Sequence, residues 1–107
     1  MVDQELDELK REFLAEAEEK VREMQTALEG QPNNDALQRL GYLAHQLKGS
    51  GGSYGYQRIS ADAAEIEKAV EGVTTGEIDS RTEEKIQMHV VNLRAEIEKR
   101  VKELSVS

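Results

Sequence analysis

The side chains in this sequence that are best suited to chemistry are those of His45 and Lys48. Residues three or four positions apart share a face of a helix, so Lys48 and the glycine after it would lie next to His45. A neutral imidazole is a nitrogen nucleophile, and a nearby ammonium group stabilises negative charge. Phosphoryl transfer depends mostly on positioning and charge stabilisation, so this pair could accept a phosphoryl group on His45, with Lys48 stabilising its charge.

Glycines surround this histidine at helical spacing. They occur four residues before it and four and seven residues after it, at Gly41, Gly49 and Gly52. Each glycine inside a helix costs about 0.5–1 kcal/mol relative to alanine, so their clustering needs a reason. We expect a bare strip of backbone on which a partner protein docks, with Gln46 also directed outward. Fraying of the helix end explains Gly51 and Gly52 equally well, and Gly55 is expected to shape the following turn.

Other chemistries lack the residues that they require. The chain has no cysteine, which excludes thiol catalysis, disulfides and thiolate metal sites. His89 lies beside an apolar stripe and is interpreted as a boundary histidine; a site in which two histidines bind a metal is the alternative, but neither has a second ligand at the spacing of helical zinc motifs. The acidic residues follow solvated helix faces and no phosphate-binding glycine loop occurs, so we expect neither acid–base catalysis nor a bound metal, ATP or other cofactor.

The stretch around His45 resembles the central helix of the histidine phosphotransfer (HPt) domains of bacterial two-component phosphorelays. These domains carry a histidine, then Lys-Gly after two intervening residues, then a second glycine; the matching residues here are His45, Lys48, Gly49 and Gly55. Ile66 and Glu67 resemble a hydrophobic-Glu pair in the next helix of that family. The residues G-S-Y-G-Y at 52–56 also look like the stretch after the phosphorylated histidine of chemotaxis kinases, a branch of the same fold.

The resemblance implies a phosphorelay carrier that is not itself an enzyme. His45 would accept a phosphoryl group from a sensor histidine kinase or a receiver domain and pass it to a response regulator, whose receiver domain would supply Mg²⁺. Two other functions stay open. The chain could be a chemotaxis-type phosphoacceptor domain, phosphorylated directly by an ATP-binding kinase domain on a longer chain, or a helical adaptor that binds receivers without carrying phosphate.

Four amphipathic helices are expected to position these residues. Apolar side chains recur every three or four positions over about 3–29, 35–52, 57–71 and 80–104. Asp35 and Ser80 are each followed after three residues by a glutamine or a glutamate, the spacing of a capping box at a helix start. Helices joined by short loops pack most simply as an antiparallel bundle, so we predict an all-α, up-down-up-down four-helix fold forming a single domain over 1–107.

Charge and composition limit the partners. The chain of 107 residues has 22 acidic and 14 basic side chains and a net charge of −8, which disfavours nucleic acids and anionic membrane surfaces. Aromatic residues make up only 4%, as in a small solvated helical domain. No apolar run approaches the ~20 residues of a membrane span. We therefore expect a monomeric, cytoplasmic protein with protein partners, and neither nucleic acid nor membrane among them.

Overall fold

The computed structural model of the chain describes residues 4–30, 32–73 and 77–106, and within these ranges it contains four α-helices. Helix α1 spans Gln4–Ala27, α2 spans Asn34–Ser53, α3 spans Gln57–Glu71 and α4 spans Ser80–Val106. The helix ends lie within two residues of the expected ones. The prediction of an all-α, four-helix fold is confirmed.

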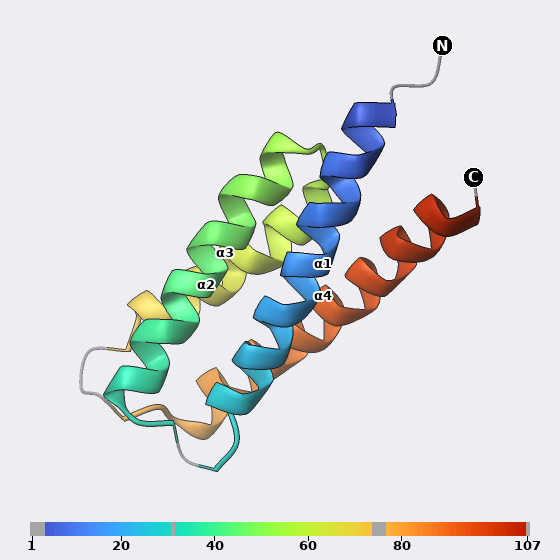
Figure 1. The fold of residues 1–107 in the computed structure, drawn as a ribbon. Helices are drawn as coiled ribbons and strands as arrows, with labels where there is room; N and C mark the ends of the chain where they lie inside the picture. Colours follow the sequence, from blue (N-terminus) through green and yellow to red (C-terminus); the bar gives the residue numbers. More distant parts are fainter. Residues whose placement is uncertain (1–3, 31, 74–76, 107) are drawn as a thin grey trace.

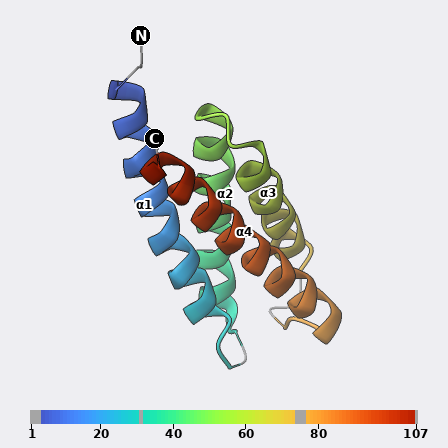
Figure 2. The ribbon, with the colours of Figure 1, turned by 90° about the vertical axis from the view of Figure 1, so that its right-hand side faces the viewer.

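The helices pack side by side, and Figure 1 shows the chain reversing its direction at each loop. Close backbone contacts join α1 to α2, α2 to α3, α3 to α4 and α4 back to α1. The four helices therefore form a closed square, with α1 diagonal to α3 and α2 diagonal to α4. Figure 2 views this arrangement from the side on which α4 crosses in front of the other helices.

The core is a column of aliphatic side chains to which all of the helices contribute. The largest fully buried side chains are those of Leu14, Met24, Leu40, Leu43, Leu47, Ile59, Ile66, Ile86, Val90, Leu93 and Ile97. Full burial of one such side chain stabilises the fold by about 1.5–3 kcal/mol. This burial also sets the rotation of each helix, and so it decides which residues of α2 and α3 face outward.

The starts of α2 and α4 differ from the predicted ones. Asn33 Oδ1 accepts a hydrogen bond of 2.8 Å from the Ala36 amide, so Asn33, and not Asp35, caps α2. In the same way, Asp79 lies just before α4, and its Oδ1 accepts a hydrogen bond of 2.7 Å from the amide of Thr82 in the first turn. Asp79, and not Ser80, therefore caps α4. Short side chains with a carbonyl or carboxylate oxygen are strong N-caps. The predicted capping residues were therefore wrong, and they lie inside the first turns.

The turn between α2 and α3 is held against α1. Gly55 has φ +81°, a left-handed conformation that favours glycine, as a turn-shaping residue requires. The rings of Tyr54 and Tyr56 stack on Phe13 of α1, with centroid distances of 5.2 and 5.9 Å. The helix continues through Gly51 and Gly52 to Ser53, so the fraying considered for these two glycines is not observed.

Candidate functional site

His45 stands on the outer face of α2, with 67% of its side chain exposed. Its neighbours Leu43, Ala44 and Leu47 point into the core and are buried. Because 3.6 residues make one helical turn, burial of these three side chains turns position 45 away from the core. The structure thus places the imidazole where the apolar pattern of α2 predicts it.

A glutamate on α3 binds both of the predicted reactive side chains. His45 Nδ1 lies 2.6 Å from Oε2 of Glu67, and Lys48 Nζ donates a hydrogen bond of 2.6 Å to Oε1 of the same carboxylate. The Glu67 side chain is only 15% exposed, whereas the imidazole is open to solvent. One carboxylate beneath the surface therefore fixes both the ring and the ammonium group.

The charges in this cluster determine which nitrogen of His45 is available. The hydrogen bond from the Lys48 ammonium, with a smaller one from His45, holds the pKa of Glu67 below its usual value. The same bond raises the pKa of Lys48. Glu67 is therefore ionised near neutral pH and can only accept hydrogen bonds. In a neutral ring the proton must then lie on Nδ1, which leaves the lone pair on Nε2; among the residues that the structure describes, none bonds Nε2.

The role of Glu67 could not be predicted from the spacing of residues in the sequence. Glu67 lies 22 positions from His45, and no local pattern links the two. The one signal was the resemblance of Ile66 and Glu67 to a hydrophobic-Glu pair. Lys48 bonds the same carboxylate through its ammonium group, a contact that the sequence did not indicate.

Backbone contacts between α2 and α3 bring Glu67 within reach. Ser60 Oγ donates a hydrogen bond of 2.9 Å to the backbone carbonyl of Lys48. A Cβ added at Gly51 would lie 3.2 Å from both Ile59 Cγ2 and the Ser60 amide nitrogen, so the absence of a side chain lets the helices approach closely. The glycine-rich end of α2 thus helps to set the distance across which Glu67 acts.

The predicted docking glycines have different surroundings. A Cβ at Gly49 would meet nothing within 4 Å, and one at Gly52 would make an ordinary contact of 3.6 Å with Ser60 Oγ. Gly41, in contrast, is partly buried, and a Cβ there would lie 3.2 Å from Val70 Cγ1 of α3. Gly49 and Gly52 are exposed beside His45, whereas Gly41 has a packing role between α2 and α3 that the sequence did not indicate.

The remaining candidates are held by local contacts. Gln46 Nε2 donates a hydrogen bond of 2.8 Å to Tyr42 Oη on the surface of α2. His89 of α4 is mostly buried, and its Nδ1 lies 2.9 Å from Oδ1 of Asp62 on α3, as fits a boundary histidine. Within the described ranges, no group of three or more His, Cys, Asp or Glu side chains is arranged to hold a metal ion.

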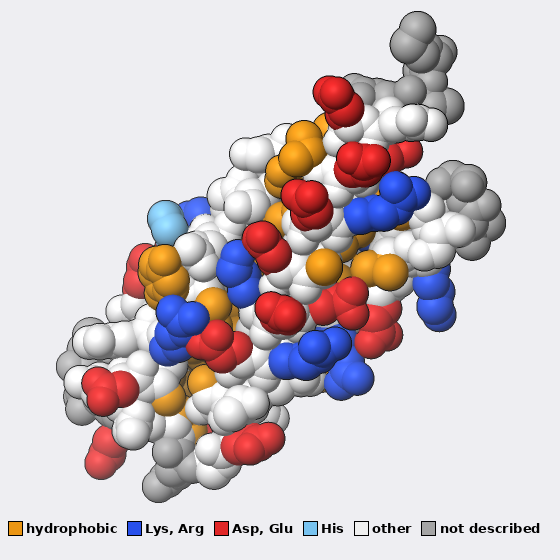
Figure 3. Space-filling model, in the orientation of Figure 1, with side chains coloured by type: hydrophobic (Ala, Val, Ile, Leu, Met, Phe, Trp, Pro, Cys, Tyr) orange, Lys and Arg blue, Asp and Glu red, His pale blue; other side chains and the backbone are white. Residues whose placement is uncertain are grey.

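The outer surface carries charges of both signs. On the face shown in Figure 3, acidic and basic side chains are interspersed, and hydrophobic side chains form small separate groups. Among the helices of the described ranges, none has the length and apolar character needed to cross a membrane.

Comparison with known protein families matches residues 8–104 to the Hpt domain, and this match covers nearly the whole chain. Comparisons with curated proteins and with solved structures give no significant match. The family match confirms the resemblance found around His45, and it agrees with the four-helix fold. The chain therefore belongs to the Hpt domain family, whose members transfer phosphoryl groups through a histidine in two-component phosphorelays.

Proposed function

We propose that His45 is the phosphoacceptor of this domain and that it reacts through Nε2. The observation that carries this proposal is the 2.6 Å contact between Nδ1 and the Glu67 carboxylate, made by a ring whose other edge is exposed. Such a contact selects the tautomer with a free lone pair on Nε2 and orients the ring. In the Ser-His-Asp triads of hydrolases, a carboxylate likewise sets the tautomer and the orientation of the catalytic histidine.

In the transfer step, the Nε2 lone pair attacks the phosphorus of an acyl phosphate on an aspartate of a receiver domain. The N–P bond forms as the P–O bond to the aspartate breaks, and the aspartate leaves as a carboxylate. The proton on Nδ1 stays in place, so the ring gains positive charge, which the Glu67 carboxylate stabilises. Donation to the next receiver is the reverse of this step, and neither direction needs a base on this chain.

Lys48 supports the phosphorylated state in this proposal. An ammonium group has three N–H donors, and Glu67 Oε1 uses one of them. The others can turn to phosphoryl oxygens on the neighbouring imidazole, because the two side chains lie three residues apart on one helix.

The remaining chemistry belongs to the partners. We expect Mg²⁺ and the acidic pocket to lie in the receiver domain, and this chain to act as a monomeric, cytoplasmic carrier that is not a complete enzyme. We expect the phosphoryl group to pass from a sensor histidine kinase or a receiver domain to a response regulator. The partner that is phosphorylated first sets the direction of this transfer.

Substitution of His45 by glutamine tests the assignment. His45→Gln should keep its helical circular dichroism, because the side chain is exposed, and should lose all labelling by a phosphorylated receiver or a histidine kinase. Labelling that survives at any other residue would refute the role of His45. Labelling of the wild type by a kinase domain but by no phosphorylated receiver would favour a chemotaxis-type acceptor. Binding of a receiver without any labelling of the chain would favour an adaptor.

A further inference from the structure

Tyr42 is a large, exposed aromatic residue one helical turn before His45. Its side chain is on the surface of α2, where the residue is 52% exposed. Residues three apart on a helix have Cβ atoms about 5–6 Å from each other. Any protein that brings a phosphoryl group to His45 therefore approaches Tyr42 as well.

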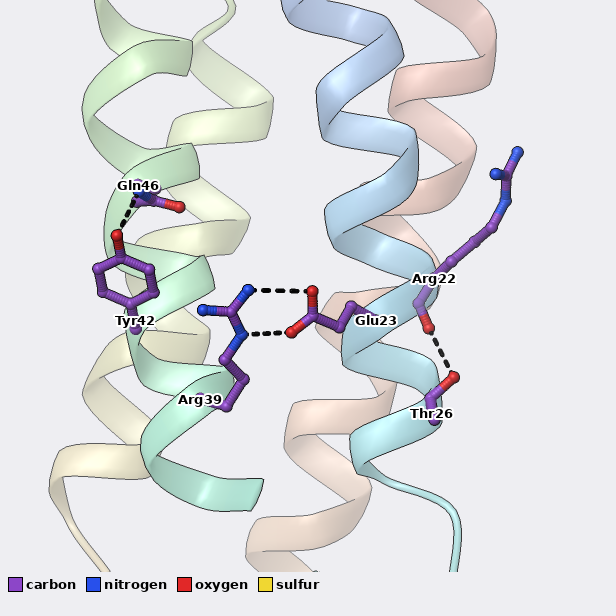
Figure 4. Close-up of polar contacts among 6 residues, drawn as sticks. All are labelled: Arg22, Glu23, Thr26, Arg39, Tyr42 and Gln46. Atoms are coloured by element: carbon purple, nitrogen blue, oxygen red, sulfur yellow. Dashed lines mark hydrogen bonds and ion pairs between the residues drawn. The ribbon is translucent and has the colours of Figure 1, made fainter. Parts of the chain in front are cut away.

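Tyr42 has contacts with residues one turn before and one turn after it on α2, and Figure 4 shows the three side chains. One turn further along, Gln46 Nε2 donates a hydrogen bond of 2.8 Å to the Tyr42 hydroxyl oxygen. One turn before, the guanidinium carbon of Arg39 lies 5.4 Å from the ring centroid, a cation–π distance. A surface tyrosine fixed in this way loses little conformational freedom when a partner covers it.

Arg39 is itself fixed to the neighbouring helix. Its Nε and Nη2 form a two-pronged ion pair with the Glu23 carboxylate of α1, and the Nη2 bond is 3.1 Å long. Figure 4 shows this pair bridging the space between α1 and α2. An open hollow beside it, between the same two helices, has Lys20, Leu43 and Gln46 among its lining residues. The surface beside Tyr42 is therefore hollowed, and the Arg39–Glu23 pair links α1 and α2 across it.

The two sides of His45 differ in chemistry. Toward α3, Lys48 and Glu67 form a polar cluster that holds the ring. Toward α1, Tyr42 offers an aromatic ring, and its hydroxyl group, which accepts from Gln46, still has its own proton to donate. The second side is suited to contact a partner, because aromatic residues at the centre of an interface contribute much of its binding energy.

We propose that Tyr42, positioned by Gln46 and by the Arg39–Glu23 pair, is the anchor on which a receiver domain docks before it exchanges phosphate with His45. This inference rests on the proposed function. The receiver is the occupant because its docking area must be continuous with His45, and an interface of ordinary size, about 800 Å² on each partner, includes a residue one turn away. The matching receiver surface would be an apolar cleft with a hydrogen-bond acceptor for the hydroxyl group.

The test uses a receiver domain that has been phosphorylated with acetyl phosphate and Mg²⁺ and that labels the wild-type chain. Single-turnover transfer is followed at increasing receiver concentrations. Tyr42→Ala should raise the half-saturating concentration about 10-fold or more and leave the maximal rate within about 2-fold. The half-saturating concentration of Tyr42→Phe should lie between those of the wild type and Tyr42→Ala, because the ring remains while the hydroxyl and its bond to Gln46 are lost. Gln46→Ala should give a smaller increase than Tyr42→Ala.

Met88→Ala is the matched control. Met88 is 53% exposed, close to the value for Tyr42, but it lies on α4, the helix diagonal to α2. Equal half-saturating concentrations for Tyr42→Ala and Met88→Ala, with both variants folded by circular dichroism, would overturn the anchor and leave the role of His45 intact. A tyrosine variant that changes only self-association in sedimentation would assign this face to a second copy and also overturn the anchor. Failure of every receiver to label the wild type would overturn the proposed function, and the anchor with it.

Discussion

At the scale of single residues, Glu67 is the side chain that contacts both His45 and Lys48. Its two oxygens accept from His45 and Lys48, so one ionised carboxylate sets the tautomer of the ring and holds the nearest cation. Buried or half-buried carboxylates that bond a histidine orient the ring and stabilise its positive form. Glu67 contacts the ring of the proposed phosphoacceptor only at Nδ1, so we regard it as a positioning residue.

We predict that Glu67→Gln slows phosphoryl transfer to His45 by roughly 10- to 100-fold. In a glutamine one of the two carboxylate oxygens is replaced by an NH₂ group, which donates, so the two present bonds cannot both be accepted in this geometry, and part of the His45 population should shift to the Nε2–H tautomer. Single-turnover transfer gives the rate, and ¹⁵N NMR of the imidazole gives the tautomer. Glu65→Gln on the same helix, which removes only an exposed pair with Lys85, is the control. A slower rate without any change in tautomer would contradict the positioning role.

The same carboxylate makes stability depend on pH. Its pKa is lowered in the folded state, chiefly by the Lys48 hydrogen bond, from an ordinary value of 4.5. The stabilisation is therefore complete above that value and is lost as the pH falls through the lower folded pKa. The advantage of the wild type over Glu67→Gln in free energy of unfolding should therefore shrink below about pH 4.5, as the folded-state carboxylate is protonated. Urea titrations at several pH values measure it, and an advantage that persists undiminished well below that pH would contradict the ion pair.

At the scale of elements, the site depends on how closely α2 and α3 pack. Gly41 and Gly51 face α3 and allow this approach, whereas Gly49 faces open space. The bond from Ser60 to the Lys48 carbonyl fixes one helix along the other. The glycines of α2 therefore have at least two roles, helix packing and an exposed backbone beside His45.

Alanine substitutions separate these roles. Gly51→Ala should destabilise the fold by about 1–3 kcal/mol, because the new methyl group would press on the Ser60 backbone, which cannot rotate away. Gly49→Ala should stabilise it by about 0.5–1 kcal/mol, since the helix gains alanine and nothing lies within 4 Å. Urea unfolding followed by circular dichroism measures both. The larger Gly49→Gln should in addition slow transfer by hindering the partner, and stabilities that rank in the opposite order would refute this division.

At the scale of the whole molecule, the bundle supplies a rigid support for an exposed ring. The closed square of helices buries a continuous aliphatic core, and α3 and α4 are further joined by the pair of Asp62 with His89. The core lies directly behind the face of α2 that carries His45. Because the site is spread over α2 and α3, it exists only while the bundle is folded.

We predict that Leu40→Ala destabilises the bundle by about 2–5 kcal/mol, since Leu40 is fully buried and truncation leaves a cavity. This is a large part of the about 5–15 kcal/mol that stabilises a typical domain. Transfer should fall only in proportion to the unfolded fraction, which is measured by urea unfolding and transfer on the same sample. The exposed Val91→Ala is the control and should change stability by less than about 0.5 kcal/mol.

The sequence by itself determined the helices and the outward orientation of His45. Both follow from residues close together in the chain: apolar side chains every three or four positions set the helical ranges and the buried stripe, and the histidine lies opposite that stripe. The local motif was enough to indicate the Hpt family, which the family comparison confirmed.

Only the tertiary structure decided what surrounds the histidine. The pairing with Glu67 across 22 positions, the packing role of Gly41 and the link from Arg39 to Glu23 depend on how each helix is rotated and shifted along its neighbour. Core packing sets that rotation and shift, and periodicity within one helix contains no information about it. The histidine that we propose as the phosphoacceptor could therefore be singled out from local sequence, whereas the groups that contact it became visible only once the helices were packed together.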